Sequence, residues 1–245
     1  MNPIRMKFIT ETLQQQSHQN DASSNTTDGV SSSSTVLPLQ GLKALDVGCG
    51  GGLLSESLAR LGASSVTAID PSTELVAQAK AHAQLDPKTR SIDYRGGWTV
   101  EQLASEYTTE GREKNQELFD VICLLEVIEH VTDVDSVLNA VKQLLAPNGT
   151  LFVSTMSKTF KSHAVAIVGA EYVMRYLPPG THDWNQFKSP QDVEALMQQV
   201  DMEQVQVNGM VLTSPPMFGK WNWALHPTDT DINWIGAYQH KKKMI

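Results

Sequence analysis

A cluster of glycines behind a single carboxylate is the first part of this sequence whose residue types could bind a cofactor. Gly48 and Gly50 follow the apolar run 43–47 and precede a helical pattern over 53–61. Because glycine lets a backbone turn sharply and approach a ligand closely, the segment predicts a cofactor loop between a strand and a helix. Asp46 precedes the loop, where its carboxylate would repel a pyrophosphate and attract an ammonium or sulfonium group. The loop therefore favours S-adenosylmethionine.

A dinucleotide is the competing cofactor for such a loop. The G-x-G-x-x-G fingerprint needs a third glycine where this chain has Leu53. Asp70 stands at the end of the next strand-like run, where a carboxylate can accept both hydroxyls of a ribose. NAD enzymes share that acidic residue, so Asp70 does not separate the two cofactors. An NAD-dependent oxidoreductase is therefore the rival hypothesis.

Two carboxylates and an imidazole follow the apolar run 119–125. If 126–130 turned as a helix, Glu126, Glu129 and His130 would share one face. Such a trio could hold a divalent metal, with oxygen ligands favouring Mg²⁺ and the imidazole favouring Zn²⁺ or Fe²⁺. A metal would help to ionise a phenol, whose ordinary pKa is about 10, and His130 could instead act directly as a general base. A solvated helix start explains the same spacing, and the spacing alone does not choose.

The elements that must position these residues alternate along the chain. We expect strands at 43–47, 65–69, 92–94, 119–125 and 151–155, with helices at 53–61, 73–84, 99–107 and 133–145. This alternation predicts an α/β fold with a parallel sheet covered by helices on both faces, and ligands at the carboxyl ends of its strands. A helix at 190–199 and strand-like runs at 203–212 and 232–238 complete a mostly parallel seven-stranded sheet.

Composition divides the chain into three segments. We expect an N-terminal helical segment at 1–15, a flexible polar insertion at 16–40 that contains four consecutive serines, and one catalytic domain at 41–240. The net charge of −8 argues against nucleic acid as a partner, because phosphate binding needs a basic face. The two cysteines have no metal-type spacing, and no apolar run is long enough to span a membrane.

Four blocks of the sequence carry a resemblance to a known family. They read LDVGCGGGLLSESLARLGA (45–63), EVIEHV (126–131), VSTMSKTFKSHAVAIVGAEYV (153–173) and LPPGTHDW (177–184). The chain resembles the ubiquinone-biosynthesis O-methyltransferases of bacteria and mitochondria. This resemblance implies the class I methyltransferase (Rossmann-like) fold and the methylation of phenolic hydroxyls on polyprenyl dihydroxybenzoate and demethylubiquinol. A class I enzyme acting on another small phenol and a non-catalytic complex subunit are the alternatives.

The resemblance also implies roles for individual residues. The cofactor contacts that it implies, matched motif by motif, are Arg5, Gly48, Asp70 and Leu125, with Arg5 on the cofactor carboxylate. The metal ligands that it implies are Glu126, Glu129 and His130, with Mg²⁺ as the expected ion.

The resemblance further implies a polyprenylated phenolic lipid as substrate, a membrane surface and other ubiquinone-biosynthesis proteins as partners, and no nucleic acid. It places the protein at the matrix side of the mitochondrial inner membrane. The N-terminal segment is shortened relative to the family, with no transit-peptide pattern at its start. The stretch 157–177 mixes basic and apolar residues, which predicts an interfacial segment or a helix packed on the core.

Overall fold

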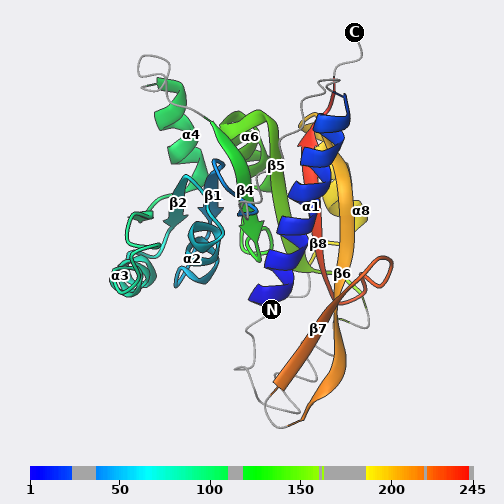
Figure 1. The fold of residues 1–245 in the computed structure, drawn as a ribbon. Helices are drawn as coiled ribbons and strands as arrows, with labels where there is room; N and C mark the ends of the chain where they lie inside the picture. Colours follow the sequence, from blue (N-terminus) through cyan, green and yellow to red (C-terminus); the bar gives the residue numbers. More distant parts are fainter. Residues whose placement is uncertain (24–36, 110–117, 160–161, 163–185, 218–219, 243–245) are drawn as a thin grey trace.

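The backbone forms one mixed sheet with helices on both faces (Figure 1). The structure is a computed structural model that describes residues 1–23, 37–109, 118–159, 162, 186–217 and 220–242. Within these ranges the sheet has eight strands in the order β3-β2-β1-β4-β5-β8-β6-β7. The strands are β1 Lys43–Val47, β2 Ser65–Asp70, β3 Asp93–Gly96, β4 Phe119–Leu125, β5 Leu145–Met156, β6 Met202–Met217, β7 Lys220–His226 and β8 Asn233–His240.

The sheet divides into a parallel part and an antiparallel part. Strands β3, β2, β1, β4 and β5 run parallel to their neighbours, which brings their carboxyl ends to one edge. Strands β8, β6 and β7 are joined to β5 and to one another by antiparallel pairing. The α/β class and the mostly parallel sheet are confirmed. Ligands of such sheets bind at the carboxyl edge, so the candidate site belongs there.

The expected count of seven strands is wrong by one. Strand β7 pairs with β6 as an antiparallel hairpin that extends beyond the rest of the sheet (Figure 1). Pro215 and Pro216 interrupt the sequence pattern just before this hairpin turns. The pairing of β6 with β7 is irregular there, shifting between Ser214 and Met217, and this irregularity accommodates residues that cannot donate to a ladder.

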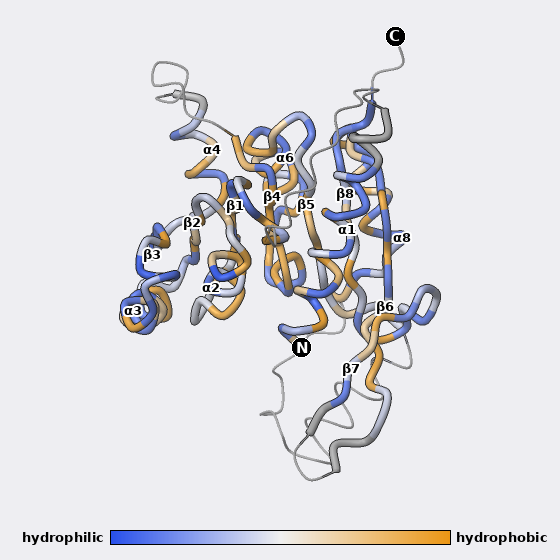
Figure 2. Tube along the Cα trace, in the orientation of Figure 1, coloured by the Kyte–Doolittle hydropathy of each residue, from blue (hydrophilic) through white to orange (hydrophobic). Residues whose placement is uncertain are grey.

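Helices cover the two faces through separate apolar clusters. One cluster joins the sheet to α4 Val100–Thr109, α6 Val134–Leu144 and α8 Pro190–Gln199. The other joins it to α1 Asn2–Ser23, α2 Leu53–Arg60 and α3 Thr73–Ala83. Successive residues of β4 alternate between the two clusters, as the pleat of a strand requires. Figure 2 shows the central strands β4 and β5 as mainly hydrophobic, since both of their faces are covered.

Local capping explains where several helices begin. The Ser72 hydroxyl accepts a hydrogen bond from the backbone N–H of Leu75 at 3.2 Å and starts α3. Asp133 accepts from Ser136 N–H at 3.0 Å and starts α6. Ser189 forms a reciprocal capping box at the start of α8. Each cap satisfies a backbone donor that has no partner inside the helix, so these starts agree with the expected ones.

The flexible insertion expected at 16–40 does not begin at residue 16 or end at residue 40. Helix α1 continues to Ser23, because no glycine or proline interrupts the chain from residue 4 to residue 23. Its polar half is attached to the sheet where the Thr150 hydroxyl donates to Gln16 Oε1 at 3.0 Å. On the far side, Leu39 is fully buried and its N–H donates to the carbonyl of Leu61. Residues 24–36 of the insertion lie outside the described ranges.

Within the part of the chain that the structure describes, no helix is both long enough and apolar enough to cross a membrane. Most of the segment 157–177, for which we expect an interfacial or core-packed helix, lies outside that part, as does most of the block 177–184.

Candidate active site

The glycine loop lies at the carboxyl end of β1, where the sequence predicts it. Gly48, Gly50 and Gly52 have positive φ angles of 73°, 49° and 80°. The loop is fixed to the neighbouring strand because the N–H groups of Gly48 and Cys49 both donate to the carbonyl of Ile69, at 2.8 and 3.0 Å. Left-handed backbone of this kind is costly for residues with a Cβ atom, so the glycines make the turn possible.

The three glycines differ in what surrounds them. A Cβ atom on Gly48 would lie 2.6 Å from Cγ2 of Val127, whereas one on Gly50 would meet no atom within 4 Å. Gly48 is therefore packed against the segment that follows β4. Gly50 borders open space, which is the side from which a ligand can approach the backbone.

Gly52 is a site residue that the sequence analysis missed, because the fingerprint directed attention to position 53. It immediately precedes α2 in a left-handed conformation. A Cβ atom on Gly52 would collide with the buried hydroxyl of Tyr94 on β3. The expected start of a helix at Leu53 was the available signal, since the residue before a helix must leave the helical conformation.

Asp70 holds the loop from the end of β2. Its Oδ2 accepts from the N–H of Gly50 at 2.9 Å, and its Oδ1 accepts from the N–H of Ser72 at 2.7 Å. A carboxylate offers about four acceptor positions, so two remain for hydroxyl donors such as those of a ribose. The carboxylate thus stabilises the loop and keeps capacity for a ligand.

Asp46 lies beneath the loop and not on its open side. Its side chain is 2% exposed, and its Oδ2 accepts from the Ser55 hydroxyl at 2.5 Å. Burial raises the pKa of Asp46 to about 6, partly offset by the bonds from Ser55. The attraction of the Asp46 carboxylate for a cation, which the sequence predicts, would therefore act across the backbone of the loop.

Replacing Asp46 with asparagine is expected to stabilise the ligand-free protein above pH 6. The native carboxyl has its pKa raised from 3.8 to about 6, so the folded state binds its proton more tightly than the unfolded chain. Native stability therefore falls as the pH rises through that window, by about 3 kcal/mol for about two pKa units, and the asparagine variant avoids this loss. Urea unfolding of both proteins at pH 4.5 and 7.5 measures the difference. An advantage of the variant that stays equal at both pH values would contradict the assignment.

Arg5 and Glu126 meet where α1 crosses the end of β4. The Arg5 guanidinium lies 2.7 Å from Glu126 Oε1, and the Ser154 hydroxyl donates to the same oxygen at 2.9 Å. Glu126 follows Leu125, the last residue of β4, in a left-handed conformation with φ 57°. Arg5 is thus brought to the carboxyl edge as expected, but its partner among the described residues is a carboxylate of the chain itself. Figure 1 shows the N-terminal end of α1 close to that edge.

The expectation that 126–130 turns as a helix is wrong. The segment is an irregular turn in which the N–H of His130 donates to the carbonyl of Val127 at 2.8 Å. Glu129 is buried, whereas His130 is exposed. The two side chains therefore do not share one face.

The metal site implied for Glu126, Glu129 and His130 does not fit this arrangement. Among the described residues no group of three His, Cys, Asp or Glu side chains is placed to hold a metal ion. Burial, followed by the neighbouring Glu126, raises the pKa of Glu129 to about 7. Glu126 is instead neutralised by Arg5.

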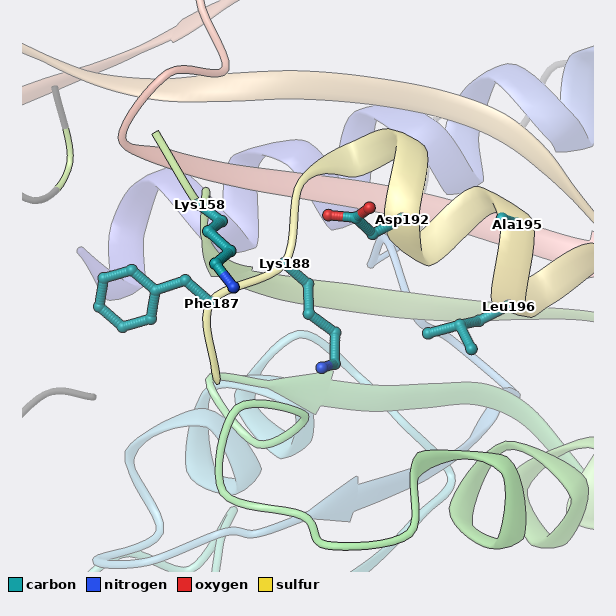
Figure 3. Close-up of a pocket in the computed structure, with 6 residues that line it drawn as sticks. All are labelled: Lys158, Phe187, Lys188, Asp192, Ala195 and Leu196. Carbon is teal, nitrogen blue, oxygen red and sulfur yellow. The ribbon is translucent and has the colours of Figure 1, made fainter. Parts of the chain in front are cut away.

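A pocket of about 410 Å³ lies beside the carboxyl end of β5, under the start of α8 (Figure 3). Figure 3 shows Lys158 and Lys188 extending their amines in the same direction. Phe187 and Leu196 add apolar surface, and Asp192 at the start of α8 adds one negative charge. The pocket combines cationic and apolar groups, a combination that suits an anion attached to an apolar body.

Comparison with known proteins gives the family. A sequence model described as a methyltransferase domain matches residues 8–207. The ubiquinone biosynthesis O-methyltransferase of Azorhizobium caulinodans is 42% identical over 235 residues, which cover 96% of this chain and 81% of that protein. The chain belongs to the ubiquinone biosynthesis O-methyltransferase family. The mitochondrial member from Arabidopsis thaliana is 38% identical over 99% of the chain, which spans 66% of that longer protein.

Solved structures agree with this family at the level of the fold. The N-methyltransferase NodS from Bradyrhizobium japonicum, in complex with S-adenosylhomocysteine, superposes with a TM-score of 0.52 at 15% identity. The match covers 83% of this chain and 80% of NodS. At this identity the likeness to NodS shows a shared fold and no more.

Proposed function

We propose that this chain transfers a methyl group from S-adenosylmethionine to a phenolic oxygen during ubiquinone biosynthesis. The acceptors are polyprenyl dihydroxybenzoate and demethylubiquinol. The observation that carries the proposal is the loop of Gly48, Gly50 and Gly52, fixed by Asp70 at the carboxyl end of β1. That loop supplies an open backbone, a ribose acceptor and a buried negative charge, in a chain about 40% identical to named family members.

The chemistry needs a nucleophilic oxygen in line with the bond between the methyl carbon and the sulfur. Holding the two reactants in that geometry supplies most of the rate enhancement, because it removes the entropic cost of their encounter. The carboxyl ends of β4 and β5 face the space above the loop, so a phenol placed there would meet the donor. The phenol must also lose its proton, since a neutral hydroxyl is a poor nucleophile.

His130 is the proposed proton acceptor. Its imidazole is exposed in the turn that follows β4, where a bound phenol can reach it. Replacing His130 with glutamine is expected to lower kcat by about 100-fold and to leave the affinity for S-adenosylmethionine unchanged. Steady-state kinetics with calorimetric titration of the cofactor measures both quantities. His18, an exposed histidine of α1, gives the matched control, and equal losses in both variants would remove the assignment.

We derive no step through a metal, because the described residues do not assemble the implied site. Dialysis against a chelator is expected to leave cofactor affinity within about twofold, since the loop contacts on β1 and β2 involve no metal ligand. A loss of methyl transfer that added Mg²⁺ restores would show that the turn rearranges and that Glu126 leaves Arg5.

The pocket lined by Lys158 and Lys188 would suit a substrate that carries an anionic group on an apolar body. A benzoate carboxylate would be attracted by Lys158 and Lys188, and its prenyl chain would lie against apolar surface. Because a polyprenylated substrate dissolves in a membrane, we propose that the protein acts at a membrane surface, with other proteins of ubiquinone biosynthesis as partners. Mitochondrial placement follows the family members of Arabidopsis thaliana and Dictyostelium discoideum, which are named as mitochondrial.

The deciding experiment supplies the purified chain with S-adenosylmethionine and a short-chain prenyl dihydroxybenzoate. Mass spectrometry should find one added methyl group on a ring oxygen. Calorimetric titration with NAD tests the rival cofactor in parallel. Binding of NAD without binding of S-adenosylmethionine would overturn the proposed function, whereas cofactor binding without methyl transfer would favour a non-catalytic subunit.

A further inference from the structure

Two buried polar side chains face each other beneath the glycine loop. Asp46 comes from β1 and Ser55 comes from the first turn of α2. Ser55 has no exposed surface and Asp46 is 2% exposed. The Ser55 hydroxyl donates to Asp46 Oδ2 at 2.5 Å, and the backbone N–H of Ser55 bonds the same carboxylate. One residue of the helix therefore supplies two donors to one carboxylate.

A buried carboxylate is unstable in its charged form unless donors replace the lost water. Ser55 is the third residue of α2, in the turn whose N–H groups have no partner inside the helix. These N–H groups also carry the positive end of the helix dipole. The first turn of α2 thus favours a negative charge at Asp46, and the hydroxyl is its contribution from a side chain.

We propose that Ser55 is a positioning residue for the cofactor, which keeps Asp46 ionised and fixed beneath the loop so that its charge can attract the sulfonium group. This inference rests on the proposed function, because it assigns to Asp46 the cation of S-adenosylmethionine. Ser55 itself touches no cofactor atom in this scheme. It acts through the carboxylate to which it donates.

Ser57, on the same helix, has a hydroxyl that bonds no carboxylate. Ser57 Oγ donates to the carbonyl of Leu53 at 2.8 Å and accepts from the side chain of Asn2 at 2.9 Å. No carboxylate is among these partners. Ser57 is therefore the matched control for the loss of a serine hydroxyl from α2.

The groups that face Asp46 from the surrounding elements are Asp70 on β2, Tyr94 on β3, Cys123 on β4 and Cys49 in the loop. Burial raises the pKa of both thiols and of the Tyr94 phenol, so these three groups are neutral near pH 7. Asp70 is the charged neighbour, and its repulsion adds to the effect of burial on the pKa of Asp46. Ser55 is the group that opposes both effects.

The test is calorimetric titration of S-adenosylmethionine between pH 5 and pH 8. The full chain is compared with the variants Ser55→Ala, Ser55→Cys and Ser57→Ala. Wild-type binding should strengthen as Asp46 ionises, with a midpoint near pH 6. Ser55→Ala should move the midpoint up by about one pH unit, since a hydrogen bond to a charged group is lost, so binding should weaken by about twofold at pH 7 and by nearly tenfold at pH 5. Ser55→Cys, a weak donor of similar size, should fall between the two proteins, and Ser57→Ala should match the wild type.

The outcomes separate this inference from the proposed function. If the wild type does not bind the cofactor at any pH, the proposed function fails first. If the wild type binds and Ser55→Ala has the same affinity and midpoint, the positioning role is wrong. A weaker affinity with an unmoved midpoint also overturns it, because a purely structural serine would lower binding equally at every pH. In an Asp46→Asn background the pH dependence near pH 6 should be absent, and Ser55→Ala should not create one.

Discussion

Replacing Asp70 with alanine is expected to weaken the binding of S-adenosylmethionine by about 1000-fold. The variant loses the acceptor for the N–H groups of Gly50 and Ser72 as well as the two free positions for ribose hydroxyls. Each hydrogen bond to a charged group contributes about 1.5 to 3 kcal/mol, and two lost ribose bonds alone give this factor. Calorimetric titration measures the affinity, and thermal unfolding shows whether the loop anchor also affects stability.

Asp93 supplies the matched control for this change. It stands on the adjacent strand β3, but its side chain is 51% exposed and pairs with Arg95. Asp93→Ala should leave cofactor affinity unchanged, because exposed ion pairs contribute little. Asp70→Asn separates the two roles of Asp70, since asparagine keeps one acceptor oxygen and loses the charge. An Asp70→Ala protein that binds the cofactor as well as Asp93→Ala does would show that the ribose lies elsewhere.

Local sequence predicts several elements of this fold to the residue. The runs 43–47 and 119–125 and the helix 190–199 coincide with β1, β4 and α8. These elements have clear signals, because buried strands are continuous apolar runs and α8 begins with a serine and a proline in capping positions. The cofactor loop was predictable for the same reason, since glycines between a strand and a helix leave few alternatives.

The features that the sequence did not predict depend on contacts between distant residues. The spacing of Glu126, Glu129 and His130 suits a helix, yet Glu126 takes a left-handed conformation in which Arg5 and Ser154 bond its carboxylate. Those partners come from α1 and β5, so no local pattern around 126 contains them. The role of Ser55 was hidden similarly, because its partner lies nine residues earlier on another element.

Strand β7 and the second half of α1 show the same limit for the fold. Hairpin β6–β7 contains two prolines, which locally disfavour a strand. The pairing register of the two strands shifts at these prolines. The polar end of α1 has little apolar surface, but Gln16 bonds to β5 and the helix lies along the sheet. In both cases tertiary contacts outweigh local propensity.

Replacing Gly48 with alanine is expected to destabilise the protein by about 3 kcal/mol and to remove measurable cofactor binding. The new Cβ atom would lie 2.6 Å from Cγ2 of Val127, in a residue whose φ is 73°. Left-handed backbone costs alanine about 1 to 2 kcal/mol, and overpacking adds about 1 to 3 kcal/mol. For a chain of this size the melting temperature should fall by about 6 to 12 °C.

A second substitution tests whether the contact with Val127 is the cause. In the double variant with Val127→Ala, the colliding methyl group is absent while the backbone strain remains. About half of the lost stability should return, and unfolding in urea measures this coupling between neighbouring positions. Strictly additive losses in the double variant would show that the collision is relieved by another route.

Gly50→Ala separates stability from ligand access at the same loop. Its Cβ atom would meet no protein atom within 4 Å, so only the backbone cost of φ 49° applies and the melting temperature should fall by a few degrees. The empty space beside Gly50 is the proposed entry of the cofactor, and the methyl group would occupy it. Gly50→Ala should therefore lose cofactor affinity without the large loss of stability expected for Gly48→Ala. If Gly50→Ala binds S-adenosylmethionine normally, the cofactor does not approach the loop from this side, and the assignment of the open face must be given up.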